Sequence, residues 1–264
     1  MIEEKFLING LEINYKIAGS GQPILILHGW GGSSDSWIRV QEILAKNGYK
    51  IICPDFPGFG KSLTPLQPWG IREYCNFVLN FTEKLNLQNF FLLGHSFGGR
   101  IAIKFATTYP EKIKSLILCD SAGIKPKPGP KTRLIYWIAK IGNAIFTPKH
   151  LARFKDTARN FFYIFLRHKD YVKAKGTMKE TIKKVFEEDL LPELSQIKTK
   201  TLIIWGQIDK MVPVKFAYIF KEKIQNSELL ILPKIGHSPH LEVPDKLAEI
   251  IVSFLANRKR ISSE

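Results

Sequence analysis

The sequence is poor in cysteine and has no long apolar run. Its 264 residues include only three cysteines, Cys53, Cys75 and Cys119, an odd and scattered set that does not fit a disulfide framework. No apolar stretch approaches the roughly 18 residues that a membrane-spanning helix needs. The first ten residues, MIEEKFLING, are acidic and lack the apolar segment of a signal peptide. We therefore expect a cytoplasmic protein with reduced thiols, of which Cys53 and Cys119 should be buried because each ends an apolar run.

Motifs for metals, phosphates and dinucleotides are also missing. There is no His-Glu-x-x-His pair, no paired Cys-x-x-Cys and no Gly-x-Gly-x-x-Gly after a predicted strand. The stretch GFGKS at 58–62 resembles the end of a phosphate-binding loop, but the first glycine of that motif falls on Asp55. We expect neither a metal nor a cofactor.

The charge is strongly basic and unevenly distributed. Lysine and arginine number 39 against 24 aspartates and glutamates, a formal net charge of +15. Segment 124–190 holds 16 basic and 6 acidic residues, a difference of +10. A basic excess can serve nucleic acid or an anionic membrane, but a solvated, lysine-rich surface is the more common origin, and we favour it. We expect no nucleic-acid partner, keep membrane-surface contact of this segment as the less favoured alternative, and predict no oligomeric state.

Short β-rich runs alternate with helical patterns along most of the chain. Residues 12–19 alternate apolar and polar side chains, which predicts an antiparallel strand. Continuous apolar runs, typical of strands covered on both faces of a parallel sheet, occupy 23–29, 50–56, 89–96, 113–122, 201–209 and 228–237. Helical patterns occupy 37–47, 71–85, 98–109, 215–223 and 245–257. This alternation predicts an α/β protein, an open sheet with helices on both faces.

One region breaks the alternation. Between 124 and 190 no clear strand pattern occurs, and the proline- and glycine-rich stretch KPKPGPK at 125–131 opens the segment. Three or four helix-like pieces follow. We predict a helical insertion, 124–190, between the two parts of a single core, 1–123 and 191–264.

The stretch GHSFGG at 94–99 places one serine among three glycines, directly after an apolar run. Glycine inside an element loses backbone entropy without adding packing, so a close approach must require it. Gly-x-Ser-x-Gly between a strand and a helix is the nucleophile elbow, in which Ser96 takes a strained conformation above the sheet. Gly94 and Gly98 should face neighbouring elements where a Cβ atom would clash. The helix dipole and the Phe97 amide would favour negative charge in the same space.

Ser96 needs partners, because a serine hydroxyl is a weak nucleophile that requires a base, and the base requires an orienting acid. Asp209 ends a predicted strand in WGQIDKMVP, and His237 ends the last one in LPKIGHSPHLEVP. Two other residues compete for these roles. Asp120 lies at the end of the strand run 113–122, and His240 follows three residues after His237.

These ordered motifs, which span nearly the whole chain, resemble the α/β-hydrolase fold superfamily. The resemblance implies a Ser-Asp-His triad in this chain order, made here by Ser96, Asp209 and His237. The family's acid lies in a Gly-x-x-Asp-x-x-Val-Pro turn, which favours Asp209 over Asp120. Its base directly follows a glycine, which favours His237 over His240. The resemblance also implies a mostly parallel, twisted sheet of eight strands with helices on both faces and a helical cap inserted after the sixth strand.

The stretch HGWGGSSDSW at 28–37 resembles the loop after the third strand of this superfamily. The resemblance implies that the backbone amides of Trp30 and Phe97 form an oxyanion hole, which costs no reorganisation during reaction. It also implies that His28 braces this loop. In the similar loop PDFPGFGKS at 54–62, we expect turn formers rather than catalysts.

In the superfamily the cap lies above the catalytic serine, and two stretches of this insertion are strongly apolar, 133–146 and 161–166. Their aromatic side chains are candidates for binding a small apolar acyl or aromatic substrate: Tyr136, Trp137, Phe161, Phe162 and Phe165. The alternative for any single one of them is packing against the rest of the protein, which we favour slightly.

Together these features predict a serine hydrolase that cleaves a carboxylic ester through an acyl-enzyme. A C–C bond hydrolase of the meta-cleavage-product type uses the same triad and is the first alternative. Those relatives usually carry Asn before the tryptophan of the oxyanion region, where this chain has Ser36 before Trp37. A non-catalytic small-molecule receptor on the same fold is the alternative from another class, and it would need no complete triad. Ser96 in place of an aspartate argues against haloalkane dehalogenases and epoxide hydrolases.

Overall fold

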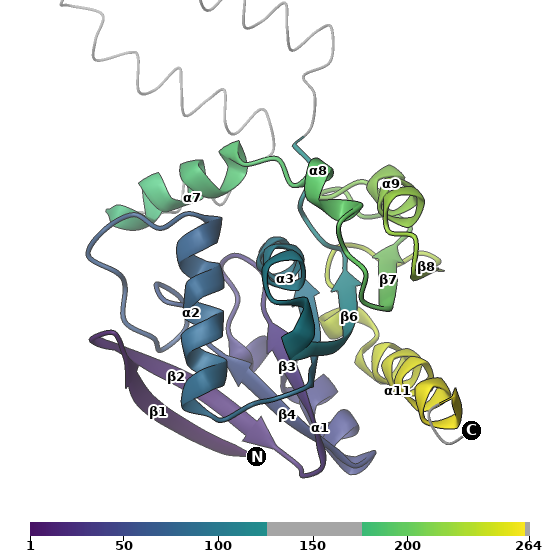
Figure 1. Cartoon of the computed structure of the whole chain (residues 1–264), viewed down its shortest axis with the longest axis horizontal. Helices are drawn as coiled ribbons and strands as arrows, with labels where there is room; N and C mark the ends of the chain where they lie inside the picture. The colour runs from purple at the N-terminus through teal and green to yellow at the C-terminus, as the bar shows by residue number, and fades with distance from the viewer. Residues whose placement is uncertain (126–175, 262–264) are drawn as a thin grey trace, which may run out of the picture.

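The structure, a computed structural model, describes residues 1–125 and 176–261 (Figure 1). Its centre is a sheet of eight strands in the order β1-β2-β4-β3-β5-β6-β7-β8. The strands are β1 (Ile2–Ile8), β2 (Leu11–Ala18), β3 (Gln22–Leu27), β4 (Tyr49–Pro54), β5 (Phe90–His95), β6 (Ile113–Cys119), β7 (Thr201–Gly206) and β8 (Ser227–Leu232). Only the pairs β1–β2 and β2–β4 are antiparallel; all other pairs of this sheet are parallel. The prediction of a mostly parallel, eight-stranded α/β sheet is confirmed.

Alternate residues of the buried strands face two separate cores. In β3, Ile24 and Ile26 belong to one apolar cluster, whereas Leu25 and Leu27 belong to the other. The first cluster is covered by α1 (Ile38–Lys46) and α11 (Pro244–Ile261), and the second by α2 (Ile71–Lys84), α3 (Phe97–Thr108) and α9 (Lys215–Lys223). Burial on both faces explains why the parallel strands are continuous apolar runs in the sequence.

Strand β1 is an exception to this burial on both faces. Most side chains of β1 are exposed, and its sequence IEEKFLI shows no alternation. Its position comes from the hairpin with β2, in which Ile8 pairs with Leu11 and Ile2 with Ile17. The two turn residues, Asn9 and Gly10, have φ angles of 48° and 81°. Asn-Gly is the dipeptide that two-residue hairpin turns prefer, because both positions need positive φ.

The connection between β6 and β7 contains the predicted insertion. Its described end includes α7 (Thr177–Glu187), and the short helix α8 (Leu191–Leu194) follows. Helix α7 packs on the core through buried Ile182 and Val185, and the Trp69 amide donates a hydrogen bond of 3.0 Å to Thr181 Oγ1. Residues 126–175 lie outside the described residues. All five candidate substrate-binding residues fall in this range and so lie outside the described residues: Tyr136, Trp137, Phe161, Phe162 and Phe165.

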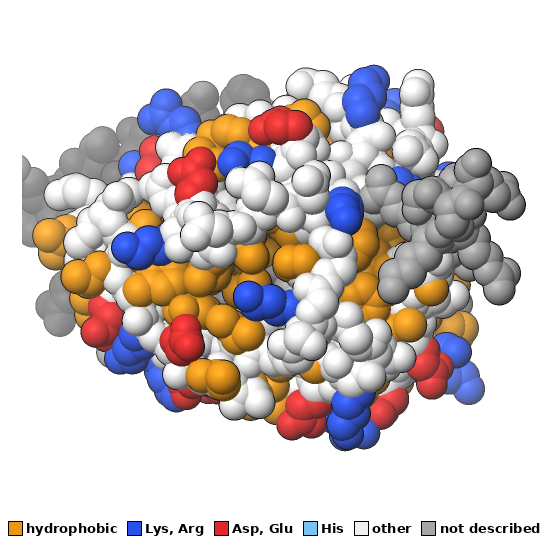
Figure 2. All heavy atoms as spheres, turned by 60° about the horizontal axis from the view of Figure 1, so that its bottom comes forward, with side chains coloured by type: hydrophobic (Ala, Val, Ile, Leu, Met, Phe, Trp, Pro, Cys, Tyr) orange, Lys and Arg blue, Asp and Glu red, His pale blue; other side chains and the backbone are white. Residues whose placement is uncertain are grey.

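Within the described ranges, no helix is both long and apolar enough to cross a membrane. Figure 2 turns the bottom of Figure 1 toward the reader and shows apolar side chains with basic and acidic ones interspersed around them. On this side of the molecule, the basic side chains of the described residues are therefore not gathered into one patch.

The three cysteines, Cys53, Cys75 and Cys119, are buried and free, which confirms the prediction for Cys53 and Cys119. Burial raises the pKa of each thiol, that of Cys75 to about 12. Nucleophilic cysteines have lowered thiol pKa values. These three side chains are therefore core residues rather than candidate nucleophiles.

Candidate active site

Ser96 lies at the sharp turn between β5 and α3. Its φ of 51° and ψ of −113° fall in a region that residues other than glycine rarely adopt. Three backbone hydrogen bonds hold this turn: the Ser96 amide donates to the Cys119 carbonyl at 3.2 Å, and the Ser96 carbonyl accepts from Gly99 and Ala122, each at 3.0 Å. The structure thus places Ser96 in the strained elbow that the sequence predicts.

The glycines around Ser96 allow close packing of the backbone. A Cβ atom at Gly94 would lie 2.7 Å from the Cβ of Ala102, and one at Gly98 would lie 2.1 Å from the carbonyl oxygen of Leu27. Neither distance is compatible with a side chain. Because both positions are bare, α3 can begin directly against β3 and β5, and this position of α3 sets the direction of the Ser96 side chain.

Three side chains from the segments that follow β5, β7 and β8 form one chain of hydrogen bonds. His237 Nε2 and Ser96 Oγ are 2.9 Å apart, and His237 Nδ1 and Asp209 Oδ2 are 2.7 Å apart. A carboxylate only accepts, so Nδ1 carries the imidazole proton and Nε2 is free to accept from the Ser96 hydroxyl. The structure therefore brings together the three residues that the sequence singled out as nucleophile, acid and base.

The Asp209 side chain is held by its own loop. Its Oδ1 accepts hydrogen bonds from the amides of Met211 at 2.7 Å and Val212 at 2.9 Å. The indole Nε1 of Trp205 donates to the Val212 carbonyl at 2.9 Å and ties this loop to the buried end of β7. With Oδ1 occupied by the loop, Oδ2 is directed at His237.

The backbone on both sides of His237 is also fixed. One carboxylate, that of Glu242, accepts from the Gly236 amide at 2.9 Å and from the Ser238 amide at 3.2 Å. The carbonyl of His237 accepts from His95 Nε2 at 2.8 Å. Three contacts therefore hold a residue that lies in a loop and must keep its ring aligned between two partners.

The loop after β3 lies beside the elbow. The rings of Trp30 and Phe97 pack edge to face with centroids 5.3 Å apart. His28 Nδ1 donates to the Gly29 carbonyl at 2.8 Å, and its Nε2 accepts from the Phe56 amide at 2.9 Å. His28 thus joins this loop to the 54–62 loop, the bracing role that the family resemblance implies. Among the described residues, neither the Trp30 nor the Phe97 amide donates a backbone hydrogen bond.

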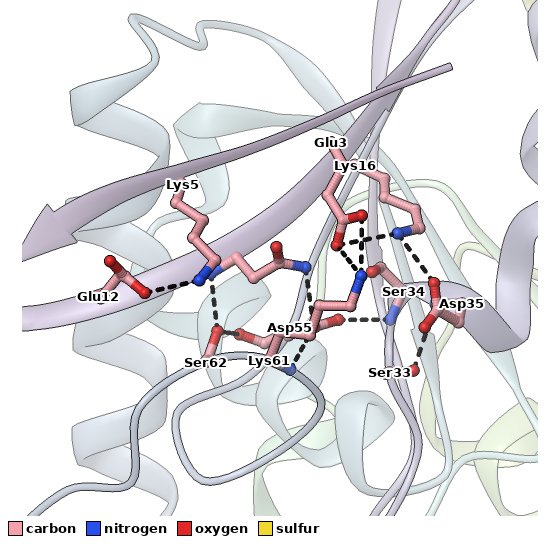
Figure 3. A network of polar contacts seen from close by, with 11 residues as sticks. Glu3, Lys5, Glu12, Lys16, Ser33, Ser34, Asp35, Asp55, Lys61 and Ser62 are labelled. Carbon is pink, nitrogen blue, oxygen red and sulfur yellow. Dashed lines mark hydrogen bonds and ion pairs between the residues drawn. The ribbon is translucent and has the colours of Figure 1, made fainter.

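Figure 3 shows the polar network that holds the same two loops. The Asp55 carboxylate accepts from the Ser34 amide at 2.6 Å and from the Lys61 amide at 2.9 Å, and the Ser62 hydroxyl donates to the Asp55 carbonyl at 2.7 Å. Lys16 extends the network through its ion pair of 2.8 Å with Asp35. Asp55 is therefore a loop-fixing residue.

The competing base, His240, has a different environment. Its ring stacks on Trp37 with centroids 4.4 Å apart and an interplanar angle of 5°. Burial lowers the pKa of His240 to about 3, so this imidazole stays neutral. The hydrogen bond to the Ser96 hydroxyl belongs to His237.

The competing acid, Asp120, is fully buried beside Asp209, and its Oδ1 accepts from the Gly206 amide at 2.8 Å. Within the described ranges, Asp120, Asp209 and His237 form the one group of three side chains whose donor atoms could together approach a metal, all lying within 4.8 Å of one another. Two of these atoms already face each other in the His237–Asp209 hydrogen bond. The donor set is therefore committed to hydrogen bonding, and we do not propose a metal there.

This arrangement can activate a hydroxyl. An imidazole that accepts from Ser96 and donates to a fixed carboxylate can take the serine proton and remain stabilised as a cation. The end of β5 and the first turn of α3 add a helix N-terminus on the same side, which favours developing negative charge.

The chain is similar to known proteins over nearly its whole length. The sequence pattern described as the alpha/beta hydrolase fold matches residues 22–143. A 2-hydroxy-6-oxo-6-(2'-aminophenyl)hexa-2,4-dienoic acid hydrolase of Metapseudomonas resinovorans is 31% identical over 98% of this chain and 93% of its own length. The chain belongs to the alpha/beta hydrolase fold family. Lipase 1 of Psychrobacter immobilis, another relative of this alpha/beta hydrolase, is 27% identical over 96% of the chain and 83% of its own length.

Solved structures are similar over the same extent. A membrane phospholipase A, described as a bacterial virulence factor, superimposes on this alpha/beta hydrolase with a TM-score of 0.76 and 27% identity, over 97% of this chain and 86% of its own. The relatives of the chain therefore include lipases as well as a dienoic acid hydrolase.

Sequence reasoning alone did not assign roles to three residues of this alpha/beta hydrolase site. His95 and Glu242 hold the backbone of His237, and Asp120 adjoins Asp209. One signal was available: Glu242 lies five residues after His237, close enough for a short helix to fold its carboxylate back onto the preceding amides. The position of Asp120 relative to Asp209 depends on the register of β6 and β7, which the sequence does not show.

Proposed function

We propose that this alpha/beta hydrolase is a serine hydrolase that cleaves a carboxylic ester by two-step acyl transfer. His237 takes the proton of Ser96, whose Oγ attacks the ester carbonyl carbon. The amides of Trp30 and Phe97 receive the oxyanion. The imidazolium, oriented by Asp209, then protonates the leaving alcohol, and a water activated by the same imidazole releases the acid.

The observation that carries this proposal is the relay of 2.9 Å and 2.7 Å from the Ser96 hydroxyl through His237 to Asp209. A passive serine in a glycine-rich turn would need neither the strained backbone nor an imidazole with a fixed tautomer. A receptor without catalytic activity would likewise have no use for the complete relay.

The direct test is Ser96→Ala, with the exposed Ser253→Ala on α11 as the matched control. Ser96→Ala should lower kcat for a chromogenic ester by about 10⁴-fold or more, since the members of such a triad act as a unit. A fluorophosphonate should label the native protein and the control but not Ser96→Ala. Near-native turnover by Ser96→Ala would rule Ser96 out as the nucleophile, and a native protein inactive toward every ester and unlabelled would favour the receptor.

The substrate we propose is a small ester with an apolar acyl or aromatic group, bound in part by the aromatic residues of the insertion. Each buried methylene contributes about 0.8 kcal/mol, so each added acyl carbon should raise kcat/KM up to about fourfold until the pocket is full. The measurement is kcat/KM for nitrophenyl esters from acetyl to decanoyl at low and high salt. A flat profile would contradict the apolar pocket, and a profile that collapses with salt would favour charge steering by the basic segment instead.

One observation favours a second candidate, a C–C bond hydrolase of the meta-cleavage-product type. The relative from Metapseudomonas resinovorans, 31% identical over nearly the whole chain, is a hydrolase of a 2-hydroxy-6-oxo-dienoic acid. The same nucleophile, base and oxyanion site could serve this reaction. A vinylogous diketone acid and an ester of equal size should be compared by kcat/KM: preference for the ester supports the first proposal, and preference for the diketone replaces it with the second.

A further inference from the structure

Asp120 ends β6 in an unusual environment for a carboxyl group. It is completely buried, and its φ of 42° lies in the left-handed region that asparagine and aspartate tolerate better than other side chains. Its amide donates to the Ile204 carbonyl at 2.9 Å, and its Oδ1 accepts from the Gly206 amide at 2.8 Å. Backbone and side chain are therefore both attached to β7, the strand whose following loop carries Asp209.

The two buried carboxyl groups lie side by side, with oxygen atoms within 4.8 Å of each other, and a side-chain hydrogen bond to Asp209 is among the causes that raise the pKa of Asp120. Carboxylates have acceptors only, so a hydrogen bond between two carboxyl groups requires one proton. Asp209 cannot be the donor through its known contacts, because Oδ1 accepts from two amides and Oδ2 accepts from His237. The proton that joins the pair therefore belongs to Asp120.

We infer that Asp120 is a neutral carboxylic acid that donates a hydrogen bond to Asp209 and thereby acts as a positioning residue for the Ser96–His237–Asp209 relay. The inference rests on the proposed function. It adds a fourth member to the relay and gives the pair of carboxyl groups two distinct roles, one as donor and one as acceptor.

The groups around Asp120 explain why its proton is retained. Burial, opposed in part by the hydrogen bond from Gly206, raises the pKa of Asp120 to about 9, with the negative charge of Asp209 as a further cause. The titratable side chains that face it are Asp209 from the loop after β7, His237 from the loop after β8, and Cys119 of its own strand, whose thiol lies 3.7 Å from Oδ2. Charging Asp120 would place two carboxylates side by side out of water.

The consequence for the relay is pH-dependent. Below a pH of about 9, the Asp120 proton bonds the two carboxyl groups and holds the Asp209 side chain. Above that pH the proton is lost, the hydrogen bond becomes a repulsion, and Asp209 should lose its alignment with His237. We therefore expect an alkaline decline in kcat that originates from Asp120.

The experiment compares Asp120→Asn with Asp120→Leu in the full chain, with the exposed Asp245→Asn as the matched control. Asparagine keeps both functions, since its NH₂ group can donate to Asp209 and its oxygen can accept from Gly206. Asp120→Asn should retain kcat within about threefold at pH 7.5 and should lose the alkaline decline. Asp120→Leu, which lacks both hydrogen bonds, should lose about 10- to 100-fold in kcat with little change in KM. The control should keep the native pH profile.

A second measurement keeps the inference testable if Asp120→Leu does not fold. In the Ser96→Ala protein labelled with ¹³C at aspartate carboxyl groups, the Asp120 signal, assigned by its absence in the additional Asp120→Asn variant, should be that of a neutral acid at pH 7 and should titrate near pH 9. An Asp120 that is ionised at pH 7, or an Asp120→Asn enzyme with the native alkaline decline, would overturn the inference. An active Ser96→Ala protein would instead overturn the proposed function, so the two failures can be told apart.

Discussion

Asp209 and Asp120 carry the same side chain, follow neighbouring parallel strands and lie within 4.8 Å of each other, but their surroundings differ. Asp209 accepts from two amides of its own loop and from the ring of His237. Asp120 accepts from the single amide of Gly206 and has the Cys119 thiol and Asp209 as further neighbours. The number of donors that converge on each carboxyl group is the physical difference between them.

This difference explains how one fold uses two adjacent acids. Hydrogen bonds from amides favour the charged form of a carboxyl group, and burial without enough donors favours the neutral form. The Asp209 loop supplies donors because it turns sharply after β7 and points successive amides inward. Asp120 receives only the Gly206 amide, so in our proposal it keeps its proton and donates it to Asp209.

The largest expected effect separates the two acids by activity. Asp209→Asn should lower kcat by about 10⁴-fold, because an amide in place of the carboxylate favours the wrong imidazole tautomer. Asp120→Asn should remain within about threefold of the native kcat. Steady-state kinetics on both variants at pH 7.5 is the measurement. Equal losses, or a larger loss for Asp120→Asn, would move the acid to Asp120.

A smaller effect tests the partner that Asp209 orients. Glu242→Ala removes the carboxylate that holds the Gly236 and Ser238 amides on both sides of His237. Looser positioning of the ring should lower kcat about tenfold and change KM much less, since the ring acts on the reacting atoms rather than on substrate binding. The matched control is Glu249→Ala, an exposed glutamate of α11. Indistinguishable kcat values for the two variants would remove Glu242 from the positioning of His237.

Much of the fold could be predicted because burial on both faces leaves a plain signature in the sequence. The six continuous apolar runs all contain parallel strands, but each run extends past the C-terminal end of its strand. The run at 228–237, for example, continues beyond the end of β8 at Leu232, since Ile235 of the following loop also packs in the core. Apolar periodicity reports burial and does not distinguish a strand from a buried loop. The hairpin of β1 shows the converse, because an exposed strand has no such signature.

Some residues of the site could likewise be predicted from the sequence, and others could not. Ser96, Asp209 and His237 could be predicted because each lies in a recognisable turn or loop that follows a strand. The neutral acid at Asp120 could not be predicted, because its role depends on which groups converge on it after folding. The same holds for His95, whose Nε2 donates to the His237 carbonyl across 142 residues of sequence. The roles of Trp30 and Phe97 as oxyanion donors, and of the aromatic residues of the insertion, stay predictions.

A still smaller effect concerns stability and tests whether Asp120 is neutral in the folded protein. The pKa of Asp120 is raised to about 9 in the folded protein, whereas an unfolded aspartate titrates near pH 4. Between these values the unfolded chain binds fewer protons, so the carboxyl group lowers the stability of the native protein as pH rises, by up to ~1 kcal/mol per pH unit.

Asp120→Asn removes this dependence. At up to ~1 kcal/mol per pH unit above pH 4 and about 2–4 °C per kcal/mol for a chain of this size, its unfolding temperature should exceed the native one by up to roughly 8–16 °C at pH 8. The difference should shrink toward pH 4. Thermal unfolding across this range, with Asp245→Asn as control, is the measurement. A variant less stable than the native protein at pH 8 would contradict a buried neutral acid.

The smallest expected effect concerns His240, which burial keeps neutral as it does Asp120. Because His240 is a base, its effect on stability has the opposite dependence on pH. Burial lowers the pKa of His240 to about 3, and its Nδ1 has no hydrogen-bond partner among the described residues. An unfolded histidine takes up a proton below pH of about 6.5, so the folded protein should lose stability as pH falls through that value, by roughly 1 kcal/mol per pH unit. His240→Phe keeps the stack on Trp37 and removes the titration. The unfolding temperature of the variant relative to that of the native protein should therefore rise by a few degrees between pH 7.5 and pH 5, while the difference caused by Asp120→Asn should fall over the same range.

His240→Phe should also retain activity, because the Ser96 hydroxyl is bonded to His237. Loss of activity to the level of Ser96→Ala would instead identify His240 as the base, and parallel pH trends for the two variants would show that burial is not what keeps both groups neutral.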